Sequence, residues 1–376
     1  MSEWRIPFNR ASLTGDELAY LRDAIDHGHI SGDGPYTKRC EDVLERELGA
    51  ARVLLTTSCT HALEAAAILL DLGPGDEVIV PSFTFVSTAA AFALRGATIV
   101  FADVRRDTLN LDESLVPELV NERTRAIVPV HYAGVGCELD ALAAHGVPLV
   151  EDNAQGLFGR YRGRALGTFG ALAAQSFHET KNLTCGEGGA LVVNDPALVE
   201  RAEVVREKGT NRKQFFRGQV DKYTWVDLGS SYVLTDLLAG FLAAQLEKRG
   251  EIQAARRDLW QRYDTDLRDW AVEQGVGTPT VPEHCEQSWH MYYLVLPSLA
   301  ARSELIARLR ERGILAVFHY QPLHVSKMGR AFGGRPGQCP VSEEVADRLV
   351  RLPFFTAMTE AEQAEVIEVV TSFRDL

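Results

Sequence analysis

The chain has 376 residues, of which 46% are hydrophobic and 24% are charged. This composition is typical of a folded chain large enough for two domains, and it excludes a disordered or low-complexity protein. The formal net charge of −13 argues against a general nucleic-acid binder and against a polybasic membrane binder.

Cysteine usage and the longest uncharged run bear on the cellular compartment. Six cysteines are scattered along the chain without a CxxC pair, which is typical of reduced thiols in a cytosol and predicts no metal site. The uncharged run Val78–Leu94 contains Pro81 and falls short of the ~20 apolar residues of a spanning helix. The N-terminal residues are charged and lack the apolar core of a signal peptide. We therefore expect a cytoplasmic protein.

Short β-branched runs alternate with longer amphipathic stretches through the first two thirds of the chain. Seven runs are predicted as strands: Val53–Leu55, Val78–Val80, Thr98–Phe101, Ala126–His131, Val147–Glu151, Ala173–Phe177 and Ala190–Asn194. Five stretches have helical periodicity: Gly15–His27, Thr37–Leu48, Thr60–Leu72, Pro196–Lys208 and Thr235–Glu247. Apolar strands separated by helices indicate an α/β fold, with a mainly parallel seven-stranded sheet in a large domain over residues 1–248.

The pattern changes after Glu247, where a long charged helix leads into a Gly/Pro-rich stretch. The elements predicted here are helix Ile252–Trp270, strand Met291–Leu296, helix Arg302–Arg312, strand Ala316–Tyr320 and helix Glu360–Phe373. They indicate a smaller C-terminal α+β domain over residues 249–376.

Ligands of open α/β sheets bind beyond the carboxyl ends of the strands, so polar residues there are site candidates. Ser58, Cys59 and Thr60 lie between a strand and a helix, where hydroxyls and free N–H groups suit a phosphate. The alternative for this segment is a plain N-cap by Ser58 or Thr60. Asp152 directly follows another strand, where a carboxylate is costly unless it meets a cation or several donors. The alternative for Asp152 is a helix cap.

Lys181 is one of only seven lysines, and it lies between two apolar strands, five residues after Ser176. Burial would favour the neutral amine that forms a Schiff base, although a lone lysine is usually a surface charge. Phe85, after an earlier strand, is able to stack on a flat ring or to pack in the core. A phosphate loop, an aromatic, a carboxylate and then a lysine form the order that a pyridoxal 5'-phosphate (PLP) enzyme needs.

Several segments carry a resemblance to a known family. They are SCTHALEAA (58–66), PGDEVIVPSFTFVSTAAA (74–91), VPVHYAG (128–134), EDNAQG (151–156), SFHETKN (176–182), GEGGALVVN (186–194) and FHYQPLH (318–324). Through them the chain resembles the DegT/DnrJ/EryC1/StrS family of sugar aminotransferases, which has the aspartate-aminotransferase fold (PLP fold type I). REKGTNRKQFFRGQVDKYTW (206–225) and GSSY (229–232) are most similar to the dTDP-4-amino-4,6-dideoxygalactose transaminase branch.

The resemblance implies roles for individual residues. Lys181 is similar to the Schiff-base lysine, Asp152 to the partner of the pyridinium nitrogen, and Gln155 to the residue beside the ring hydroxyl. Phe85 falls where an aromatic stacks on the ring, and Tyr320 lies in a motif expected to contact substrate. Further cofactor contacts are implied for Ser58, Cys59, Thr60, Ser176 and His178.

Two positions depart from the family pattern. Cys59 stands where relatives usually have glycine, so only a backbone amide is carried over. Val233 stands where many relatives have an asparagine that contacts the phosphate of the partner subunit. Ser230 or Ser231 is then the expected replacement, in a homodimer with shared active sites.

The activity implied is transfer of an amino group from L-glutamate to the C4 keto group of a dTDP-4-keto-6-deoxyhexose. The product would be a dTDP-4-amino-4,6-dideoxyhexose, either galacto or gluco. Relatives with histidine in place of the lysine perform dehydration, and Lys181 therefore favours transamination. The alternatives are a non-catalytic regulator built on the same fold and a PLP lyase acting on sulfur amino acids.

A basic and aromatic segment is the candidate for binding the sugar nucleotide. Arg212, Lys213 and Arg217 are interleaved with Phe215 and Phe216. Guanidinium groups suit a diphosphate and aromatic rings suit a nucleobase, so the segment is predicted to act as a substrate clamp. The alternative is a solvated surface loop.

Overall fold

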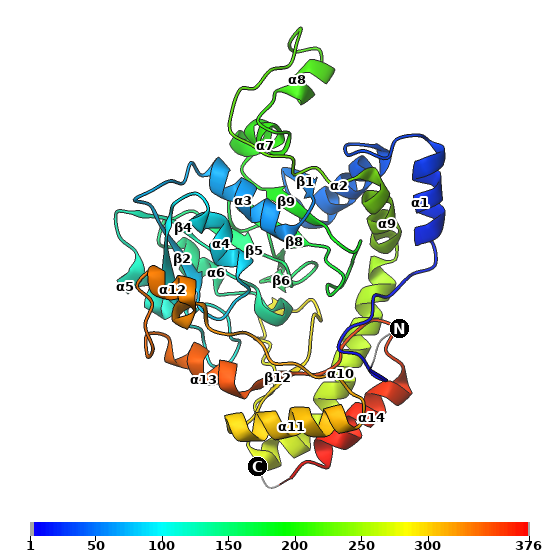
Figure 1. The fold of residues 1–376 in the computed structure, drawn as a ribbon, viewed down its shortest axis with the longest axis vertical. Helices are drawn as coiled ribbons and strands as arrows, with labels where there is room; N and C mark the ends of the chain where they lie inside the picture. Colours follow the sequence, from blue (N-terminus) through cyan, green and yellow to red (C-terminus); the bar gives the residue numbers. More distant parts are fainter. Residues whose placement is uncertain (1–3, 375–376) are drawn as a thin grey trace.

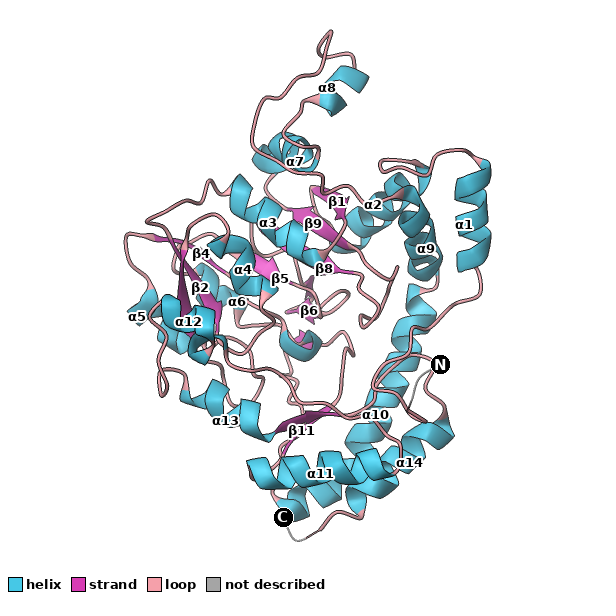
Figure 2. Ribbon diagram, viewed as in Figure 1, coloured by secondary structure: helices cyan, strands magenta, loops and turns pink. Residues whose placement is uncertain are grey.

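The computed structural model describes residues 4–374 and has a seven-stranded sheet at its centre (Figures 1 and 2). Hydrogen bonds order the strands in two groups, β1-β9-β8-β5 and β3-β2-β4. Parallel bridges Ile127–Leu149 and Val130–Asp152 join the two groups. The strands are β1 (Arg52–Thr56), β2 (Glu77–Pro81), β3 (Thr98–Ala102), β4 (Thr124–Ile127), β5 (Val150–Asp152), β8 (Leu172–Ser176) and β9 (Gly189–Val193).

Strand direction in this sheet is parallel with one exception. β9 runs antiparallel to both of its neighbours, β1 and β8, whereas the other neighbouring pairs are parallel. Each of the seven predicted strands overlaps one of these strands, and the mainly parallel α/β architecture is confirmed. A small sheet beside it is formed by β6 (Arg160–Tyr161), β7 (Arg164–Ala165) and β10 (Cys285–Glu286).

Helices flank the sheet (Figure 2). In the first two thirds of the chain the α-helices are α1 (Glu17–Asp26), α2 (Pro35–Leu48), α3 (Cys59–Leu69), α4 (Ser87–Ala93), α5 (Val116–Leu119), α6 (Leu139–Ala143), α7 (Val199–Arg206), α8 (Arg212–Phe216) and α9 (Asp236–Glu247). The 3-10 turns here are η1 (Glu113–Leu115), η2 (Tyr132–Gly134) and η3 (Pro196–Leu198).

The side chains of β1 show why both faces of the sheet must be covered. Successive residues of a strand point to opposite faces, and Val53, Leu54 and Leu55 are all fully buried. Leu54 packs in a core with residues of α3, α4 and α7. Val53 and Leu55 pack in a second core with residues of α2 and α9. The uninterrupted apolar run in the sequence is therefore explained by burial on two sides.

The C-terminal elements pack around a separate core, which includes Trp260, Tyr263 and Leu305. Ile6, from the other end of the chain, joins this core and forms a parallel bridge to Ile314. The elements that form this core are α10 (Arg249–Gln274), β11 (Tyr293–Val295), α11 (Leu299–Glu311), β12 (Leu349–Arg351) and α14 (Glu360–Thr371). The other elements of this part are η4 (Leu323–Val325), α12 (Lys327–Ala331) and α13 (Pro340–Arg348). Leu323 of η4 packs instead against the core that contains Leu54, and Val345 of α13 packs with Tyr132. We propose the domain boundary at residue 248, between α9 and α10.

One predicted element of this part is wrong. Within the described chain, the segment 316–320 forms no strand, and it contributes a single bridge between Val317 and Arg351. Its apolar and aromatic residues resemble a strand in sequence, but His319 and Tyr320 line a pocket and Phe318 is exposed. No helix among residues 4–374 combines the length and the apolar character required to cross a membrane.

Candidate active site

A pocket of about 540 Å³ lies beyond the carboxyl ends of β2, β5 and β8, the position expected for a ligand of an open α/β sheet. It brings together residues that are far apart in the chain, including ten of the predicted site residues. Those ten are Ser58, Cys59, Thr60, Phe85, Asp152, Gln155, Ser176, His178, Lys181 and Tyr320.

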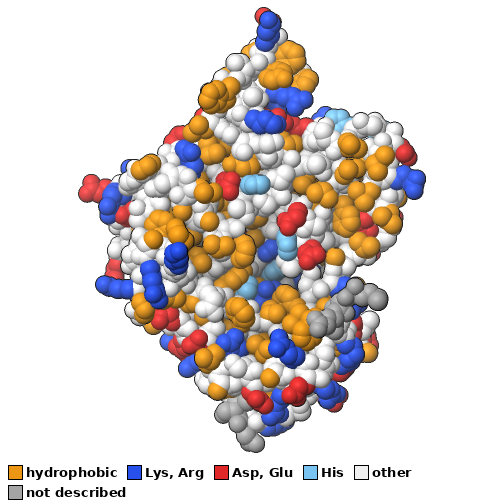
Figure 3. All heavy atoms as spheres, in the orientation of Figure 1, with side chains coloured by type: hydrophobic (Ala, Val, Ile, Leu, Met, Phe, Trp, Pro, Cys, Tyr) orange, Lys and Arg blue, Asp and Glu red, His pale blue; other side chains and the backbone are white. Residues whose placement is uncertain are grey.

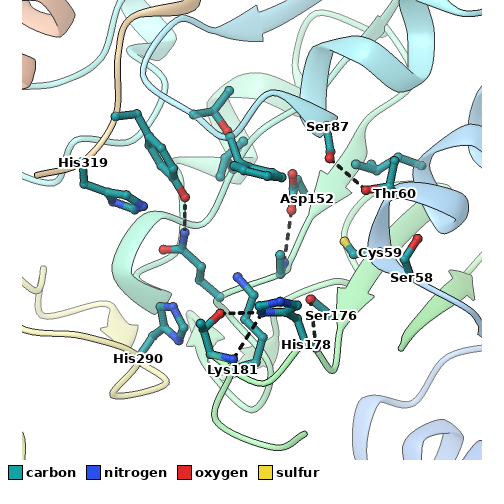
Figure 4. A pocket seen from close by; sticks show the side chains of 18 of the residues that line it. Ser58, Cys59, Thr60, Ser87, Asp152, Ser176, His178, Lys181, His290 and His319 are labelled. Atoms are coloured by element: carbon teal, nitrogen blue, oxygen red, sulfur yellow. Dashed lines mark hydrogen bonds between the residues drawn. The ribbon is translucent and has the colours of Figure 1, made fainter. Parts of the chain in front are cut away.

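The pocket has two chemically different ends (Figure 4). Small side chains with hydroxyl or thiol groups, among them Ser58, Cys59 and Thr60, gather at one end. His290 and His319 lie at the other end. Asp152 and Lys181 lie between the two ends, so both face the same space.

The first end is built on the N-terminus of α3. Ser58 is the N-cap and its hydroxyl oxygen accepts a hydrogen bond from the backbone N–H of His61 at 3.1 Å, so the plain N-cap interpretation holds for its side chain. Thr60 donates to the Ser87 hydroxyl oxygen at 2.8 Å. The first N–H groups of a helix lack partners within it, so this end is suited to an anion. Burial raises the pKa of the Cys59 thiol, which keeps it neutral.

Gly189 explains how α3 is held against the sheet. A Cβ atom at this position would collide with the peptide between Ser58 and Cys59. Only glycine therefore lets β9 approach the first turn of the helix this closely. Gly189, the second glycine of the Gly-Gly pair after the lysine loop, thus helps to fix the position of the anion-binding end.

Asp152 is a buried carboxylate held by uncharged donors. Its Oδ2 accepts a hydrogen bond from the Thr88 hydroxyl at 2.7 Å, and its Oδ1 accepts one from the N–H of Ala154 at 3.2 Å. No basic side chain among the described residues forms an ion pair with it. Because a buried charge is costly without a compensating one, the arrangement favours a ligand that brings a positive group to Asp152.

Lys181 lies in the loop that joins β8 to the antiparallel strand β9. Its backbone N–H donates to the carbonyl oxygen of His178 at 2.9 Å, which closes a turn in this loop. Burial lowers the pKa of the Lys181 amine; the nearby Cys59 and Asp152 oppose this shift, and Arg351 adds to it. A larger share of the neutral, nucleophilic amine follows from this shift.

Three other predicted residues complete the walls. The Gln155 side chain accepts a hydrogen bond from the N–H of Ala133 at 2.7 Å and donates to the Tyr320 hydroxyl oxygen at 3.2 Å. Phe85 is 57% exposed and its ring lies 6.4 Å from the ring of Tyr320, so it belongs to the pocket and not to the core. The ring Nδ1 of His178 lies 2.9 Å from the hydroxyl of Thr180, close to Ser176.

His290, His319 and Arg351 line the pocket and Thr88 lies beside it, and none of the four was predicted as a site residue from the sequence. Arg351 Nη1 donates to His319 Nε2 at 3.3 Å, which leaves Nδ1 of that ring as the donor to the Tyr132 hydroxyl oxygen at 2.9 Å. His319 lies inside the motif 318–324, and this motif was a signal from which it could have been predicted. Arg351 belongs to an ordinary apolar strand, and no local pattern marks it.

Five predicted residues lie outside the pocket, in or beside the segment 207–231, which projects from the body of the molecule (Figure 1). Ser230 and Ser231 are exposed, and Ser231 pairs with Glu207. Acidic residues of the same chain engage the three bases. Arg217 pairs with Glu203 at 2.7 Å, Lys213 with Glu203 and Asp33 at 3.8 Å each, and Arg212 with Glu207 at 3.7 Å.

The projecting segment also carries exposed aromatic residues. Phe216 is 69% exposed and Trp225 is 74% exposed. Figure 3 shows hydrophobic and basic side chains side by side on this projection. None of the residues that line the pocket belongs to this segment.

Comparison with known proteins gives a consistent result. Residues 11–371 match the model of the DegT/DnrJ/EryC1/StrS aminotransferase family. The chain is 31% identical to the spore coat polysaccharide biosynthesis protein SpsC of Bacillus subtilis, over 97% of this chain and 96% of that one.

Solved structures agree over almost the whole length. DesV of S. venezuelae, in complex with a ketimine intermediate, has a TM-score of 0.89 and 32% identity, with 98% of each chain covered. The putative sugar aminotransferase Spr1654 of Streptococcus pneumoniae, in its PMP form, has a TM-score of 0.91 and 26% identity, covering 98% of this chain and 99% of that one.

Proposed function

Since the chain belongs to the DegT/DnrJ/EryC1/StrS aminotransferase family, we propose that it is a PLP-dependent sugar-nucleotide aminotransferase. The amino donor is L-glutamate and the acceptor is the C4 keto group of a dTDP-4-keto-6-deoxyhexose. The observation that supports this most strongly is a single pocket lined by Lys181, Asp152 and the N-terminus of α3.

The residues of the pocket fit PLP. The N-terminus of α3 offers N–H groups and the Thr60 hydroxyl to the phosphate, at the end opposite His290 and His319. Asp152, which is buried and forms no ion pair with any described residue, suits a protonated ring nitrogen. Phe85 is free to stack on a flat ring, and Gln155 is in reach of its substituents.

When bound, PLP supplies an electron sink for the carbon that loses its proton. Asp152 would hold the protonated ring nitrogen and so maintain that sink. Lys181 would hold the resting cofactor, and its freed amine would serve as the general base and acid that moves a proton at the reacting carbon. The lowered pKa of Lys181 suits this role, because the amine must be unprotonated to accept the proton.

The acceptor and the assembly are proposed from the resemblance of residues 206–232 and from their position. Since the segment projects from the body of the molecule and lines no part of its own pocket, we assign its role to the pocket of a second copy in a homodimer. Ser230 and Ser231 would there contact the phosphate, and Arg212, Lys213 and Arg217 would face the sugar nucleotide. Tyr320 contacts the substrate from within the same chain.

The test is incubation of the purified protein with PLP, L-glutamate and dTDP-4-keto-6-deoxyglucose. We expect 2-oxoglutarate and a dTDP-4-amino-4,6-dideoxyhexose in equal amounts, and the proton coupling constants at C4 in the NMR spectrum will distinguish galacto from gluco. Formation of 2-oxoglutarate without an aminated sugar would contradict the proposed acceptor. Borohydride reduction should attach the cofactor to the peptide that contains Lys181, and attachment to another lysine would contradict the proposed role.

A further inference from the structure

His290 lines the pocket, and one nitrogen of its ring has no hydrogen-bond partner. The residue is 4% exposed and shares the pocket with Lys181. Ring Nδ1 lies 2.9 Å from Oδ1 of Asn182, the residue that directly follows Lys181 in the chain. No group among the described residues forms a hydrogen bond with Nε2. Because buried polar atoms are rarely left without a partner, Nε2 is suited to a donor that comes within its reach inside the pocket.

The amide of Asn182 decides which ring nitrogen carries the proton. Its Nδ2 donates to the carbonyl oxygen of Ser288 at 2.6 Å and to Oε1 of Gln253 at 3.1 Å. Oδ1 of Asn182 is therefore the acceptor in the contact with His290, and Nδ1 of the ring carries the proton. Nε2 of the neutral ring is then a hydrogen-bond acceptor.

The turn that carries His290 is held in a strained conformation. Trp289 has a φ of 58°, in the left-handed region that is unfavourable for a bulky residue. Arg256 donates to the carbonyl oxygen of Trp289 at 3.0 Å and to that of His290 at 2.5 Å. Strain of this kind persists only where the surroundings fix the backbone, and it is typical of functional sites. The position of the ring is therefore fixed from both sides of the turn.

The ring of His290 stays uncharged, so Nε2 keeps its lone pair. Burial lowers the pKa of His290 well below its usual value, and the positive charge of Lys181 adds to this shift. The other groups that act in the same direction are Arg351, Arg256 and His319. A neutral imidazole accepts a hydrogen bond from an ammonium group, whereas a charged imidazole would repel it.

We propose that Nε2 of His290 accepts a hydrogen bond from the Lys181 amine once that amine has taken up the proton of the reacting carbon. The two side chains are close enough for the charge of Lys181 to act on the ring (Figure 4). Within the described residues the Lys181 amine forms no hydrogen bond, so the pocket holds a donor and an acceptor that both lack partners.

In this arrangement the proton stays on Lys181, and the hydrogen bond stabilises the positive charge that develops there. Asn182 is then a positioning residue, because it fixes the proton on Nδ1 and leaves Nε2 free to accept. The inference rests on the proposed aminotransferase function and adds a residue to its proton-transfer step.

The test compares His290→Asn with His290→Gln, because each amide replaces one of the two ring nitrogens. Asparagine reaches about as far as Nδ1 and keeps the contact to Asn182, whereas glutamine reaches about as far as Nε2 and offers an acceptor to Lys181. In stopped flow of the glutamate half-reaction, His290→Asn should be about 10- to 100-fold slower, the effect of one hydrogen bond to a charged group. His290→Gln should keep most of the wild-type rate. His284→Asn is the matched control and should react like the wild type, because His284 pairs with Glu138 outside the pocket.

A titration of the cofactor-free protein gives a second readout that does not depend on turnover. Without an acceptor for its ammonium form, Lys181 should have a pKa that is lower by about 1 in His290→Asn, and His290→Gln should resemble the wild type. The pH dependence of the rate at which added PLP attaches to Lys181 measures this pKa. A ring that serves only to hold Asn182 would give the opposite order of the two variants, and that order would overturn the proposal.

Three further outcomes are decisive. Equal behaviour of the two variants would overturn the proposal, and so would a loss confined to the sugar half-reaction, which would assign Nε2 to a sugar hydroxyl. If the variants do not fold, a neutron crystal structure of the wild-type protein decides, since a proton on Nε2 of His290 would overturn the proposal. Failure of the sugar reaction, with the expected order of the variants in the glutamate half-reaction, would contradict only the acceptor.

Discussion

The hydroxyl of Thr88 donates a 2.7 Å hydrogen bond to Oδ2 of Asp152, which ties the first turn of α4 to the end of β5. Thr88 is itself fully buried and lies 2.9 Å from the hydroxyl of Thr84. The direction in which the Asp152 carboxylate points is therefore set by a side chain that does not line the pocket.

Thr88→Val should lower kcat by roughly tenfold or more, because Asp152 loses a hydrogen bond to its charged form. Thr88 is a positioning residue, so Thr88→Ser, which keeps the hydroxyl, should restore most of kcat. Steady-state kinetics with denaturant unfolding of each variant will separate the two effects. A kcat that falls only in proportion to the folded fraction would contradict the positioning role.

Asp152→Asn should retain PLP but transaminate orders of magnitude more slowly. The amide does not stabilise a protonated ring nitrogen, and the loss of such electrostatic stabilisation raises the barrier by several kcal/mol. Cofactor content is measured by absorbance and each half-reaction by stopped flow. Near-normal rates in this variant would refute the pairing.

The stability of the cofactor-free protein should depend on pH through Lys181. Because burial lowers its pKa in the folded chain, the unfolded chain holds this proton more tightly, and stability rises with pH up to the unfolded value near 10.5. Lys181→Met should therefore be more stable than the wild type at pH 7, and this advantage should shrink as the pH rises toward 10.5. Urea unfolding at several pH values measures the difference. The exposed Lys38, replaced by Met, is the control and should show no such trend.

Shared active sites predict complementation between inactive chains. Lys181→Ala chains mixed with chains altered at both Ser230 and Ser231 should recover part of the wild-type activity, because one of the two sites in each heterodimer would be intact. Tagged chains purified as a pair provide the sample. No recovery in a verified heterodimer would mean that the serines act within their own chain or not at all.

The ion pairs of the projecting segment divide its bases into two groups. Arg217→Gln should destabilise the fold by about 1 kcal/mol, because Glu203 is 3% exposed and loses a partner.

Arg212, which is 47% exposed and only loosely paired, should behave differently. Arg212→Gln should raise KM for the sugar nucleotide, more so at low salt, and leave the glutamate half-reaction unchanged. Equal loss in both half-reactions would show a structural role.

The site residues that were predicted correctly lie at or after strand ends, and such positions are recognisable in the sequence. Asp152 ends β5 and Lys181 lies in the loop that follows β8, and the topology of an α/β sheet brings such positions to one edge. Arg351 and His319 reach the pocket only through the packing of the C-terminal elements, which no local pattern describes. One partner of Lys213 has the same origin, since Asp33 is distant from it in the sequence.

The walls of the pocket come from two parts of the chain, the central sheet and the segments after α11. Asp152, Lys181 and the first turn of α3 are fixed by the central sheet, whereas Arg351, His319 and Tyr320 come from segments after α11. Exchange of these later segments would alter one wall of the pocket and leave the residues of the central sheet in place. Substitutions on the wall formed by the later segments are therefore the ones expected to change which substrates the pocket binds.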